Sequence, residues 1–168
     1  MIGLEGFLLK TFSLDEMRNM AKTIFAKALS AVEPSQILRD RIQIKKDRLW
    51  IKQDENSEKF FDLKSFDHIF LVGTGKASYS MAQAIEEIFG EWLTEGLVTT
   101  KYGHRLPLKK TEVIEAGHPI PDQNGFEGAK KIKNLLKQSG PKDLVLFLLS
   151  GGASALLPFP ADGIELKE

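Results

Sequence analysis

The sequence predicts an α/β fold: a Rossmann-like, doubly wound and mostly parallel sheet with helices on both faces. An amino-terminal helix and a small hairpin precede the sheet. Two observations lead to this prediction. From residue 69 onward, short apolar runs alternate with helical patterns, an order typical of parallel sheets with crossover helices. The run Leu144–Leu149 is also apolar throughout, so we expect both of its faces to be buried.

The amino-terminal helix is predicted from its start and stop signals. Ser13 and Glu16 form a capping box, in which each side chain accepts a hydrogen bond from the backbone amide of the other residue. Pro34 ends the helical pattern. The apolar residues at helical spacing between these signals are Leu14, Met17, Ala21, Ile24, Phe25, Ala28 and Val32.

A hairpin and a loop are expected next. Residues 42–44 and 49–51 each place apolar side chains two positions apart, on either side of a polar turn at 45–48. The following polar stretch, 53–64, is predicted to be a surface loop.

The doubly wound part follows from the remaining patterns. Apolar runs predict strands at 69–72, at 97–100, from 113 and at 144–149, and helical periodicity predicts helices at 77–88 and 126–136.

Length and composition limit the class of protein. A chain of 168 residues favours one domain with a sizeable core. Its 23 Lys and Arg balance 23 Asp and Glu, which argues against nucleic acid as a partner. The sequence has no cysteine, so it excludes disulfides, thiolate nucleophiles and cysteine-based metal sites, and it fits a cytoplasmic protein.

No membrane partner is predicted. The first residues lack a basic region and carry Glu5 within the apolar stretch, so they do not form a signal peptide. The uncharged window 144–161 is almost long enough to span a bilayer, but two glycines and two prolines interrupt it. A buried strand that runs into a glycine turn explains this window better.

The first candidate site is the segment that follows the strand at 69–72. Gly73 and Gly75 allow a tight turn and a close approach to a ligand, the next helix offers unpaired amides, and Lys76 adds a positive charge. The spacing is not that of a Walker A loop, and a dinucleotide fingerprint would need glycine in place of Ser78. The pattern indicates an anion site, with a turn that merely packs against its own helix as the alternative.

The second candidate site follows the strand at 144–149. Ser150, Gly151, Gly152 and Ser154 place two hydroxyls and two flexible backbone positions at the end of a core strand, a suitable cradle for phosphate or carboxylate. Ligands of open α/β sheets bind at the carboxyl ends of the strands, so we expect both segments to face one cleft.

Histidines supply further candidates. His104 follows the strand at 97–100 and is predicted either to face the same cleft or to be a structural hydrogen-bonding residue. His118 and Glu115 flank a rigid proline-containing loop and are candidate ligand contacts, but the pair is a weak metal motif. Asp122 is predicted to cap the next helix, and His68, at the opposite end of its strand, is predicted to be structural.

Taken together, four strings are similar to a known family. In order they are VGTGKAS, VTTKYGH, IEAGHPIPD and LVLFLLSGGASALLPFPADG. They resemble the amino-terminal domain of the bacterial and archaeal glycerate 2-kinases, a family that also has a carboxyl-terminal MOFRL domain. The resemblance covers the chain from about residue 14 to its end and rests on motifs that are individually modest and jointly specific.

The resemblance implies a function and a set of site residues. Members of the family transfer phosphate from ATP to glycerate with a divalent metal such as Mg²⁺, which gives 2-phosphoglycerate. Lys76 resembles the family's active-site lysine. The residues that match its SGGGS substrate loop are Ser150, Gly151, Gly152 and Ser154. The chain departs from that loop at Ala153, where a third glycine is usual, and alanine disfavours positive φ.

The resemblance also implies an incomplete enzyme. Family members continue well past the position of Glu168, so residues 1–168 are expected to be the amino-terminal part of the kinase domain, without the MOFRL domain and inactive alone. One alternative is a free-standing, non-catalytic module that binds an anion or a partner. A further alternative is an NAD(P)-dependent hydroxypyruvate reductase, a label that some relatives carry. The residues single out no general base and no metal ligands, and a homodimer stays among the expected partners.

Overall fold

The computed structural model describes residues 12–104 and 107–166. The chain divides into two compact units, Met1–Glu33 and Pro34–Glu168, each of which is described by itself.

The first unit contains helix α1 (Leu14–Ala31). Both halves of the predicted capping box are present: the Glu16 amide donates to Ser13 Oγ at 3.2 Å, and the Ser13 amide donates to Glu16 Oε2 at 2.8 Å. The helix is amphipathic, and among the described residues none of its own side chains is buried. The predicted helix is therefore confirmed, with its end at Ala31, three residues before Pro34.

The second unit begins with helix α2 (Pro34–Arg41) and a three-stranded antiparallel sheet. Strands β1 (Ile42–Lys45) and β2 (Arg48–Lys52) form the predicted hairpin around Lys46 and Asp47, which have positive φ angles of 48° and 64°. Two consecutive positive φ angles are the geometry of a type I′ turn.

One expectation for this part of the chain is wrong, and one helix was not predicted. Residues 53–64 are not all loop, because β3 (Glu58–Asp62) pairs with β2 and the rings of Trp50 and Phe60 stack across the pair at 5.1 Å. Pro34 does more than follow a helix, since it is the first residue of α2, where its missing amide hydrogen costs nothing. The sequence signals for β3 are weak, because charged residues flank only two aromatic side chains.

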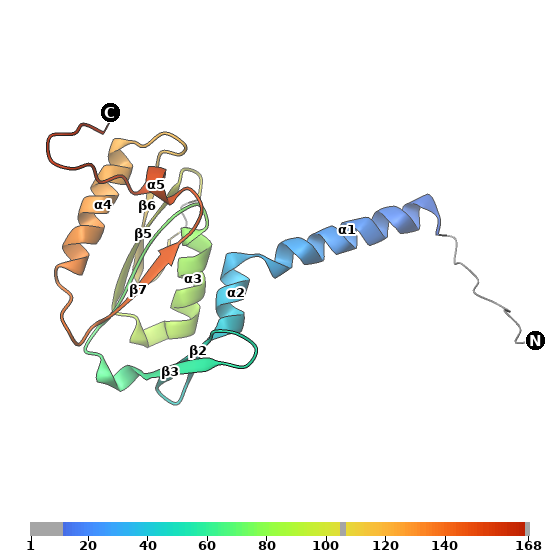
Figure 1. The fold of residues 1–168 in the computed structure, drawn as a ribbon, viewed down its shortest axis with the longest axis horizontal. Helices are drawn as coiled ribbons and strands as arrows, with labels where there is room; N and C mark the ends of the chain where they lie inside the picture. Colours follow the sequence, from blue (N-terminus) through green and yellow to red (C-terminus); the bar gives the residue numbers. More distant parts are fainter. Residues whose placement is uncertain (1–11, 105–106, 167–168) are drawn as a thin grey trace, which may run out of the picture. The chain divides into compact units, whose positions relative to one another are not determined.

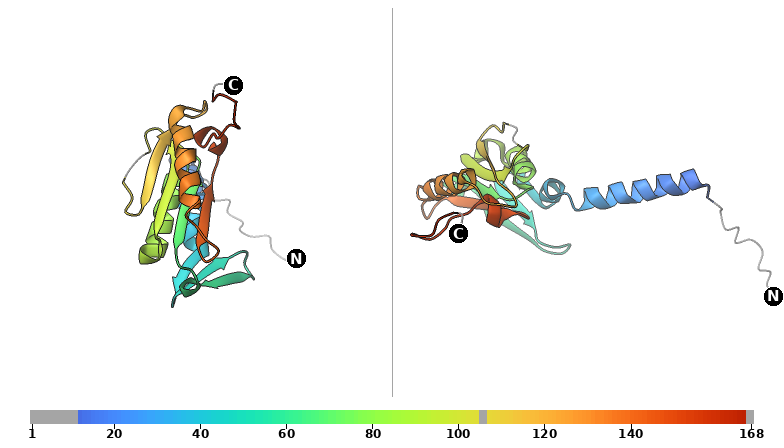
Figure 2. Two further views of the ribbon diagram at one scale, coloured as in Figure 1. Left: turned by 90° about the vertical axis from the view of Figure 1, so that its left-hand side faces the viewer. Right: turned by 90° about the horizontal axis from the view of Figure 1, so that it is seen from above.

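The second sheet has four parallel strands in the order β6-β5-β4-β7 (Figure 1). Its elements are β4 (Ile69–Thr74), α3 (Ser78–Phe89), β5 (Glu95–Lys101), β6 (Thr111–Ala116), α4 (Gln123–Leu136), β7 (Leu144–Leu149) and the short α5 (Ala153–Leu156). Single 3₁₀ turns lie at Leu63–Ser65 and Gly90–Trp92. Helices α3 and α4 lie on opposite faces (Figure 2), so the predicted doubly wound α/β fold is confirmed.

Alternate residues of the strands build two cores. On the α3 face, Leu71 and Val98 pack with Ile85 and Phe89 of the helix. On the α4 face, Phe70, Val72 and Leu97 pack with Ile132 and Leu135. This division follows from the period of two along a strand.

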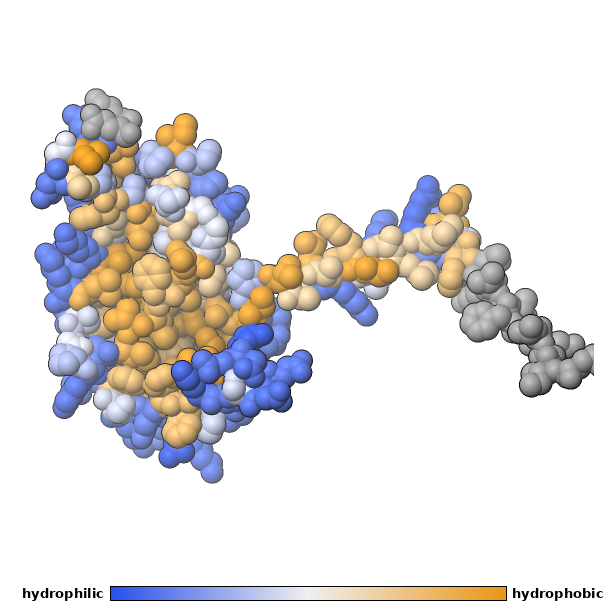
Figure 3. Space-filling view, viewed as in Figure 1, coloured by the Kyte–Doolittle hydropathy of each residue, from blue (hydrophilic) through white to orange (hydrophobic). Residues whose placement is uncertain are grey.

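Strand β7 corrects one expectation. Its bounds are those predicted, but within residues 12–104 and 107–166 only one of its faces is covered, by the core on the α3 side. Val145, Phe147 and Leu149, on the other face, are 37, 53 and 63% exposed. β7 is the last strand of the sheet, and α4 lies over β5 and β6, with side chains of β4 in the same core, and does not extend over β7. Figure 3 shows the resulting apolar area between α4 and α3, where Figure 1 places β7.

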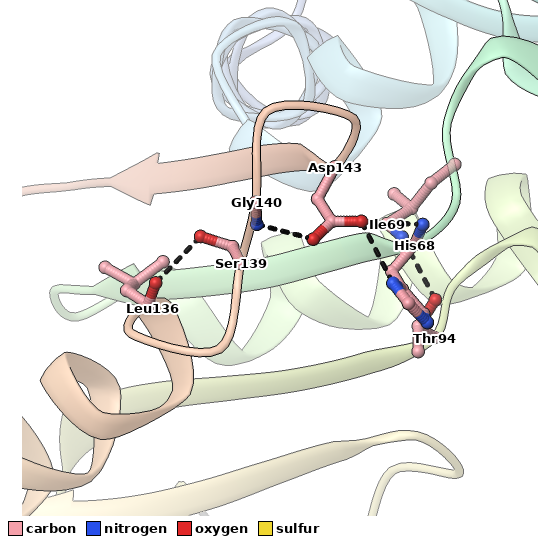
Figure 4. Close-up of polar contacts among 7 residues, drawn as sticks. All are labelled: His68, Ile69, Thr94, Leu136, Ser139, Gly140 and Asp143. Atoms are coloured by element: carbon pink, nitrogen blue, oxygen red, sulfur yellow. Dashed lines mark hydrogen bonds and ion pairs between the residues drawn. The ribbon is translucent and has the colours of Figure 1, made fainter.

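The amino ends of β4 and β7 are joined by a polar cluster (Figure 4). Asp143 accepts hydrogen bonds from the His68 amide at 3.0 Å and the Gly140 amide at 2.7 Å, and the His68 ring nitrogen Nδ1 lies 2.9 Å from its carboxylate. These contacts lower the pKa of Asp143, with the Gly140 hydrogen bond as the largest cause. His68 is therefore a structural contact at the opposite end of the sheet from the candidate loops, as predicted.

Candidate functional site

The strand order places both candidate loops at one point of the sheet. From β4 the chain moves through α3 to β5 and β6 on one side, and α4 then returns it to β7 on the other side of β4. The carboxyl ends of β4 and β7 are therefore a topological switch point, where open α/β sheets bind their ligands. The segments predicted from the sequence, 73–78 and 150–154, leave these two strands.

Gly73 and Gly75 allow the two strands and their loops to approach closely. A Cβ on Gly73 would lie 2.8 Å from the Cβ of Leu148, and a Cβ on Gly75 would lie 2.5 Å from the carbonyl oxygen of Ser150. Gly75 also has a φ of +121°, which L-residues rarely adopt. Both glycines are needed by the backbone, and their part in ligand binding stays a prediction.

Hydrogen bonds join the two loops into one unit. The Lys76 amide donates to the Gly151 carbonyl at 2.9 Å, and the Ala77 amide donates to Ser150 Oγ at 3.0 Å. The Ser150 amide donates to the carbonyl of Thr74 at 3.1 Å. The Ser150 hydroxyl thus holds the start of α3, whose own N-cap residue makes no side-chain cap.

Lys76, Gly152 and His118 come together above this unit. The Lys76 side chain runs over the second loop, because Cβ atoms added to Gly151 and Gly152 would lie 3.9 Å from its Cε and 3.3 Å from its Cγ. A Cβ on Gly152 would also lie 2.8 Å from the His118 ring. A lysine and a histidine from two different loops therefore flank the same glycine, and both side chains are exposed to solvent.

The alanine in the second loop does not disturb its backbone. Gly152 takes the left-handed conformation, with a φ of +91°, and Ala153 is the first residue of α5. The positive φ falls on a glycine that the chain retains. Ser154 lies within α5 and is exposed.

A buried hydroxyl network supports the first loop from below and was not predicted from the sequence. Ser78 Oγ lies 2.8 Å from the Gly75 carbonyl oxygen and 2.6 Å from that of Thr99, while Thr99 Oγ1 donates to Thr74 Oγ1 at 2.8 Å. All three side chains are buried. The available signal was the placement of threonines near the carboxyl ends of two otherwise apolar strands.

His104 and Asp122 belong to a second cluster, after β5 and β6. The His104 amide donates to Glu115 Oε1 at 2.9 Å, and none of the described contacts joins His104 to Lys76. Asp122 caps α4 as predicted, since the Gly125 amide donates to its Oδ1 at 3.0 Å, and the Tyr102 hydroxyl donates to its Oδ2 at 2.6 Å.

The charge of Asp122 is held by these contacts. Partial burial by itself raises the pKa of Asp122. Hydrogen bonds from Tyr102 and from nearby backbone amides lower it by more, so the pKa lies below its ordinary value. The same contact raises the pKa of Tyr102. The cluster stabilises the start of α4 and is not part of the Lys76 loops.

The described residues do not form a metal site by themselves. Across 12–104 and 107–166, no three His, Asp or Glu side chains lie close enough together to hold an ion. Among the described contacts of the two loops, Lys76, His118 and Ser150 supply a cation, an imidazole and a hydroxyl and no carboxylate, a set that suits a phosphate or carboxylate group. In the same described residues, no helix is long and apolar enough to cross a membrane.

The fold and the loops define a doubly wound α/β domain with an anion-compatible switch point. The family described as "Domain of unknown function (DUF4147)" matches residues 20–168, and the chain belongs to this family. The chain is 33% identical to the D-glycerate 2-kinase of Thermotoga maritima over 94% of its length, and 33% identical to the glycerate 2-kinase of Pyrococcus horikoshii over 91%. The resemblance to the amino-terminal domain of glycerate 2-kinases is thereby confirmed.

Solved structures agree with the sequence matches. A protein of Pyrococcus horikoshii superimposes with a TM-score of 0.78 at 34% identity over 94% of this chain. The glycerate kinase of Thermotoga maritima gives 0.71 at 33% identity over 91%. A putative hydroxypyruvate reductase of Agrobacterium vitis is 42% identical, over 58% of this chain. The chain spans about a third of the length of the glycerate kinases that it matches.

Proposed function

We propose that this chain supplies one wall of the phosphotransfer site of a glycerate 2-kinase, which transfers a phosphoryl group from ATP to glycerate. In this proposal residues 1–168 are the amino-terminal part of the kinase domain and are inactive without the rest of the enzyme. Support comes from relatives named glycerate 2-kinase that match nearly the whole chain.

One observation carries the proposal. The ammonium-bearing side chain of Lys76 lies over Gly151 and Gly152 at the switch point of the sheet, where loops from two strands are hydrogen-bonded together. The positive end of the α3 dipole adds to the same positive potential, whereas the Lys76 and Ala77 amides are already used in hydrogen bonds between the two loops. Such a site favours an anion over a neutral ligand.

The chemistry follows from what phosphoryl transfer requires. Little covalent work falls to the protein, and most of the catalysis consists of positioning and of neutralising charge. Lys76 would neutralise either the glycerate carboxylate or the transferring phosphoryl group, while the backbone around Gly151 and Gly152 holds the other anion. His118, against Gly152, is placed to donate a hydrogen bond to either one.

Ser78 favours the kinase over a nicotinamide-dependent reductase. The third glycine of a dinucleotide fingerprint allows the helix to pack closely against the strand. Here Ser78 fills that position, with its hydroxyl between the carbonyls of Gly75 and Thr99. The helix therefore starts on a hydroxyl that bridges two backbone segments, and the reductase stays the second candidate.

Calorimetric titration of the purified chain with glycerate and with 2-phosphoglycerate tests the proposal. The Lys76→Ala variant should weaken binding about tenfold to a hundredfold, the range expected for one charge-assisted contact. Lys142→Ala, which removes an exposed lysine at the other end of the sheet, is the matched control and should bind normally. Equal affinity of the wild type and Lys76→Ala would show that this lysine is not the anion contact.

An activity assay separates the remaining alternatives. The chain is incubated with ATP, Mg²⁺ and glycerate, and 2-phosphoglycerate is measured. We expect binding without turnover, as for one wall of a site. Turnover by the chain alone would contradict the expected inactivity, and an absence of binding to either glycerate compound would contradict the proposed substrate.

A further inference from the structure

His118 differs from the other residues of the candidate site in how its position is fixed. Lys76 and Ser150 belong to loops that are joined to each other by hydrogen bonds. His118 belongs to the segment 117–122, which follows β6, and it is exposed. Within the described part of the chain no hydrogen bond is formed to its ring. The place of the ring against Gly152 therefore depends on the backbone that carries it.

The carboxylate of Asp122 closes this segment into a loop. It accepts hydrogen bonds from the amide of Gly117, at the start of the segment, and from the amide of Gly125, in the first turn of α4. A Cβ on Gly117 would lie 2.5 Å from the Ile120 carbonyl oxygen and 3.0 Å from Asp122 Cγ, so the two ends lie in close contact. His118 is the second residue of this closed loop.

Tyr102, which follows β5, fixes the orientation of that carboxylate. Its hydroxyl donates to Asp122 Oδ2 at 2.6 Å, while the Gly125 amide donates to Oδ1 at 3.0 Å. The Tyr102 hydroxyl in turn accepts a hydrogen bond from Asn124 Nδ2 at 2.9 Å. One carboxylate oxygen therefore serves the helix cap, and the other is held by a residue from a different strand end. The helix cap alone would not require this second contact.

The first turn of α4 also touches the segment that follows the second candidate loop. A Cβ on Gly125 would lie 2.9 Å from Pro158 Cδ and 3.3 Å from the Leu156 carbonyl oxygen. Helix α5, which ends at Leu156, begins directly after Gly152. Both partners of the contact between His118 and Gly152 are thus anchored to the same helical turn, and the position of this turn sets the distance between them.

We propose that Asp122 and Tyr102 are positioning residues, which close the segment 117–122 and so hold the His118 imidazole against Gly152, where it donates a hydrogen bond to the bound anion. We assign the two residues no contact with substrate of their own, because they act through His118. A displacement of about 1 Å is enough to lose such a contact. The part that concerns the anion rests on the proposed function, whereas the placement of the ring does not.

A nuclear Overhauser effect in the ligand-free chain tests the placement of the ring. A Cβ on Gly152 would lie 2.8 Å from Cδ2 of His118, so the proton on this ring carbon lies close to an α-proton of Gly152. We expect a cross-peak between these two protons in the wild type. Its absence from the wild type would overturn the proposal.

Two variants loosen the segment while the start of α4 stays capped. In Asp122→Ser, serine can cap the helix but has a single side-chain oxygen. Tyr102→Phe removes only the hydroxyl of an exposed ring, so it also decides the test if Asp122→Ser does not fold. Gln123→Ala, in the same turn, is the matched control, because the Gln123 side chain donates to Glu127 and leaves the contacts of Asp122 in place.

We expect the cross-peak to be lost in Asp122→Ser, to weaken at least about twofold in Tyr102→Phe and to persist in Gln123→Ala. A cross-peak of wild-type intensity in either test variant would overturn the role of the residue that was replaced. Its loss in Gln123→Ala as well would assign the effect to any change in this helical turn, which would also overturn the proposal.

Calorimetric titration with 2-phosphoglycerate tests whether Asp122 acts through His118. Asp122→Ser and His118→Ala should each weaken binding about threefold to tenfold, the range expected for one hydrogen bond. In the His118→Ala background, Asp122→Ser should have less than about a twofold further effect, because the ring that it positions is gone. Equal losses in both backgrounds would overturn the positioning role. If the wild type binds no 2-phosphoglycerate, the proposed function fails, and the cross-peak still decides the placement of His118.

Discussion

Strands β4 and β7 are parallel neighbours with almost the same apolar character, and their surroundings are opposite. β4 is paired along both edges, and every one of its residues is buried. β7 is paired along one edge, and three of its six residues are exposed. An apolar run therefore shows what a strand is suited to, whereas its actual burial depends on which elements lie next to it.

The largest expected contrast comes from placing the same charge on both strands. Val72 and Phe147 are register partners on the same face. Val72→Asp should destabilise the fold by about 4 kcal/mol or more, because it buries an unpaired carboxylate. Phe147→Asp should cost about 1 kcal/mol or less, because its side chain reaches solvent. Urea unfolding of the two variants measures this difference, and similar losses would show that β7 is covered in solution.

Glycines in the two loops should differ nearly as much. Gly75→Ala should cost about 2–4 kcal/mol, because it combines a positive φ with overlap onto Ser150. Gly151→Ala should be neutral or stabilise by up to about 1 kcal/mol, because its Cβ would make only an ordinary contact with Lys76. Thermal unfolding compares them. A stable Gly75→Ala variant would mean that the two loops are not held together.

A smaller effect tests the support beneath the first loop. Ser78→Ala should cost about 1–2 kcal/mol, because it removes the hydroxyl shared by the carbonyls of Gly75 and Thr99. Ser80 lies two residues further along α3, and its hydroxyl donates to the Ala77 carbonyl. Ser80→Ala is the control and should change stability by about 0.5 kcal/mol or less. If chemical denaturation gave equal values for both, the buried network would have no special role.

The smallest effect concerns the amino ends of β4 and β7. The pKa of Asp143 is lowered in the folded protein, so its contacts stabilise the fold above the ordinary carboxyl pKa of about 3.9 and are lost as the pH falls below that value. Asp143→Asn should therefore be less stable than the wild type near pH 7. The difference should shrink as the pH falls from about 4 towards 2. A stability difference that did not change with pH would contradict this account of the cluster in Figure 4.

Local signals in the sequence predicted most of the fold and, of the candidate site, the two glycine-containing loops. The capping box at Ser13, the bounds of β7 and the two loops at the switch point follow from spacing, apolar runs and glycine positions, which are short-range features. β3 was missed because its sequence has no apolar alternation, and its strand conformation depends on backbone pairing with β2. The exposed face of β7 was missed because hydrophobicity does not report which neighbours are present.

The rest of the candidate site depends on contacts between distant residues. The ring of His118 lies against Gly152, and Ser150 accepts a hydrogen bond from the Ala77 amide. Both contacts arise because the carboxyl ends of the parallel strands β4, β6 and β7 lie at the same end of the sheet. No spacing in the sequence encodes these pairs. The buried hydroxyls of Thr74, Ser78 and Thr99 belong to the same class, since each has its partner on another segment.

The most direct test of the proposed anion site is amide NMR of the ¹⁵N-labelled chain during titration with 2-phosphoglycerate. The account predicts that the largest shifts fall on residues 75–78 and 150–153, with smaller shifts near His118, and that Lys76→Ala needs about tenfold to a hundredfold more ligand to reach the same shifts. Shifts confined to other segments, or an unchanged titration curve in Lys76→Ala, would contradict it.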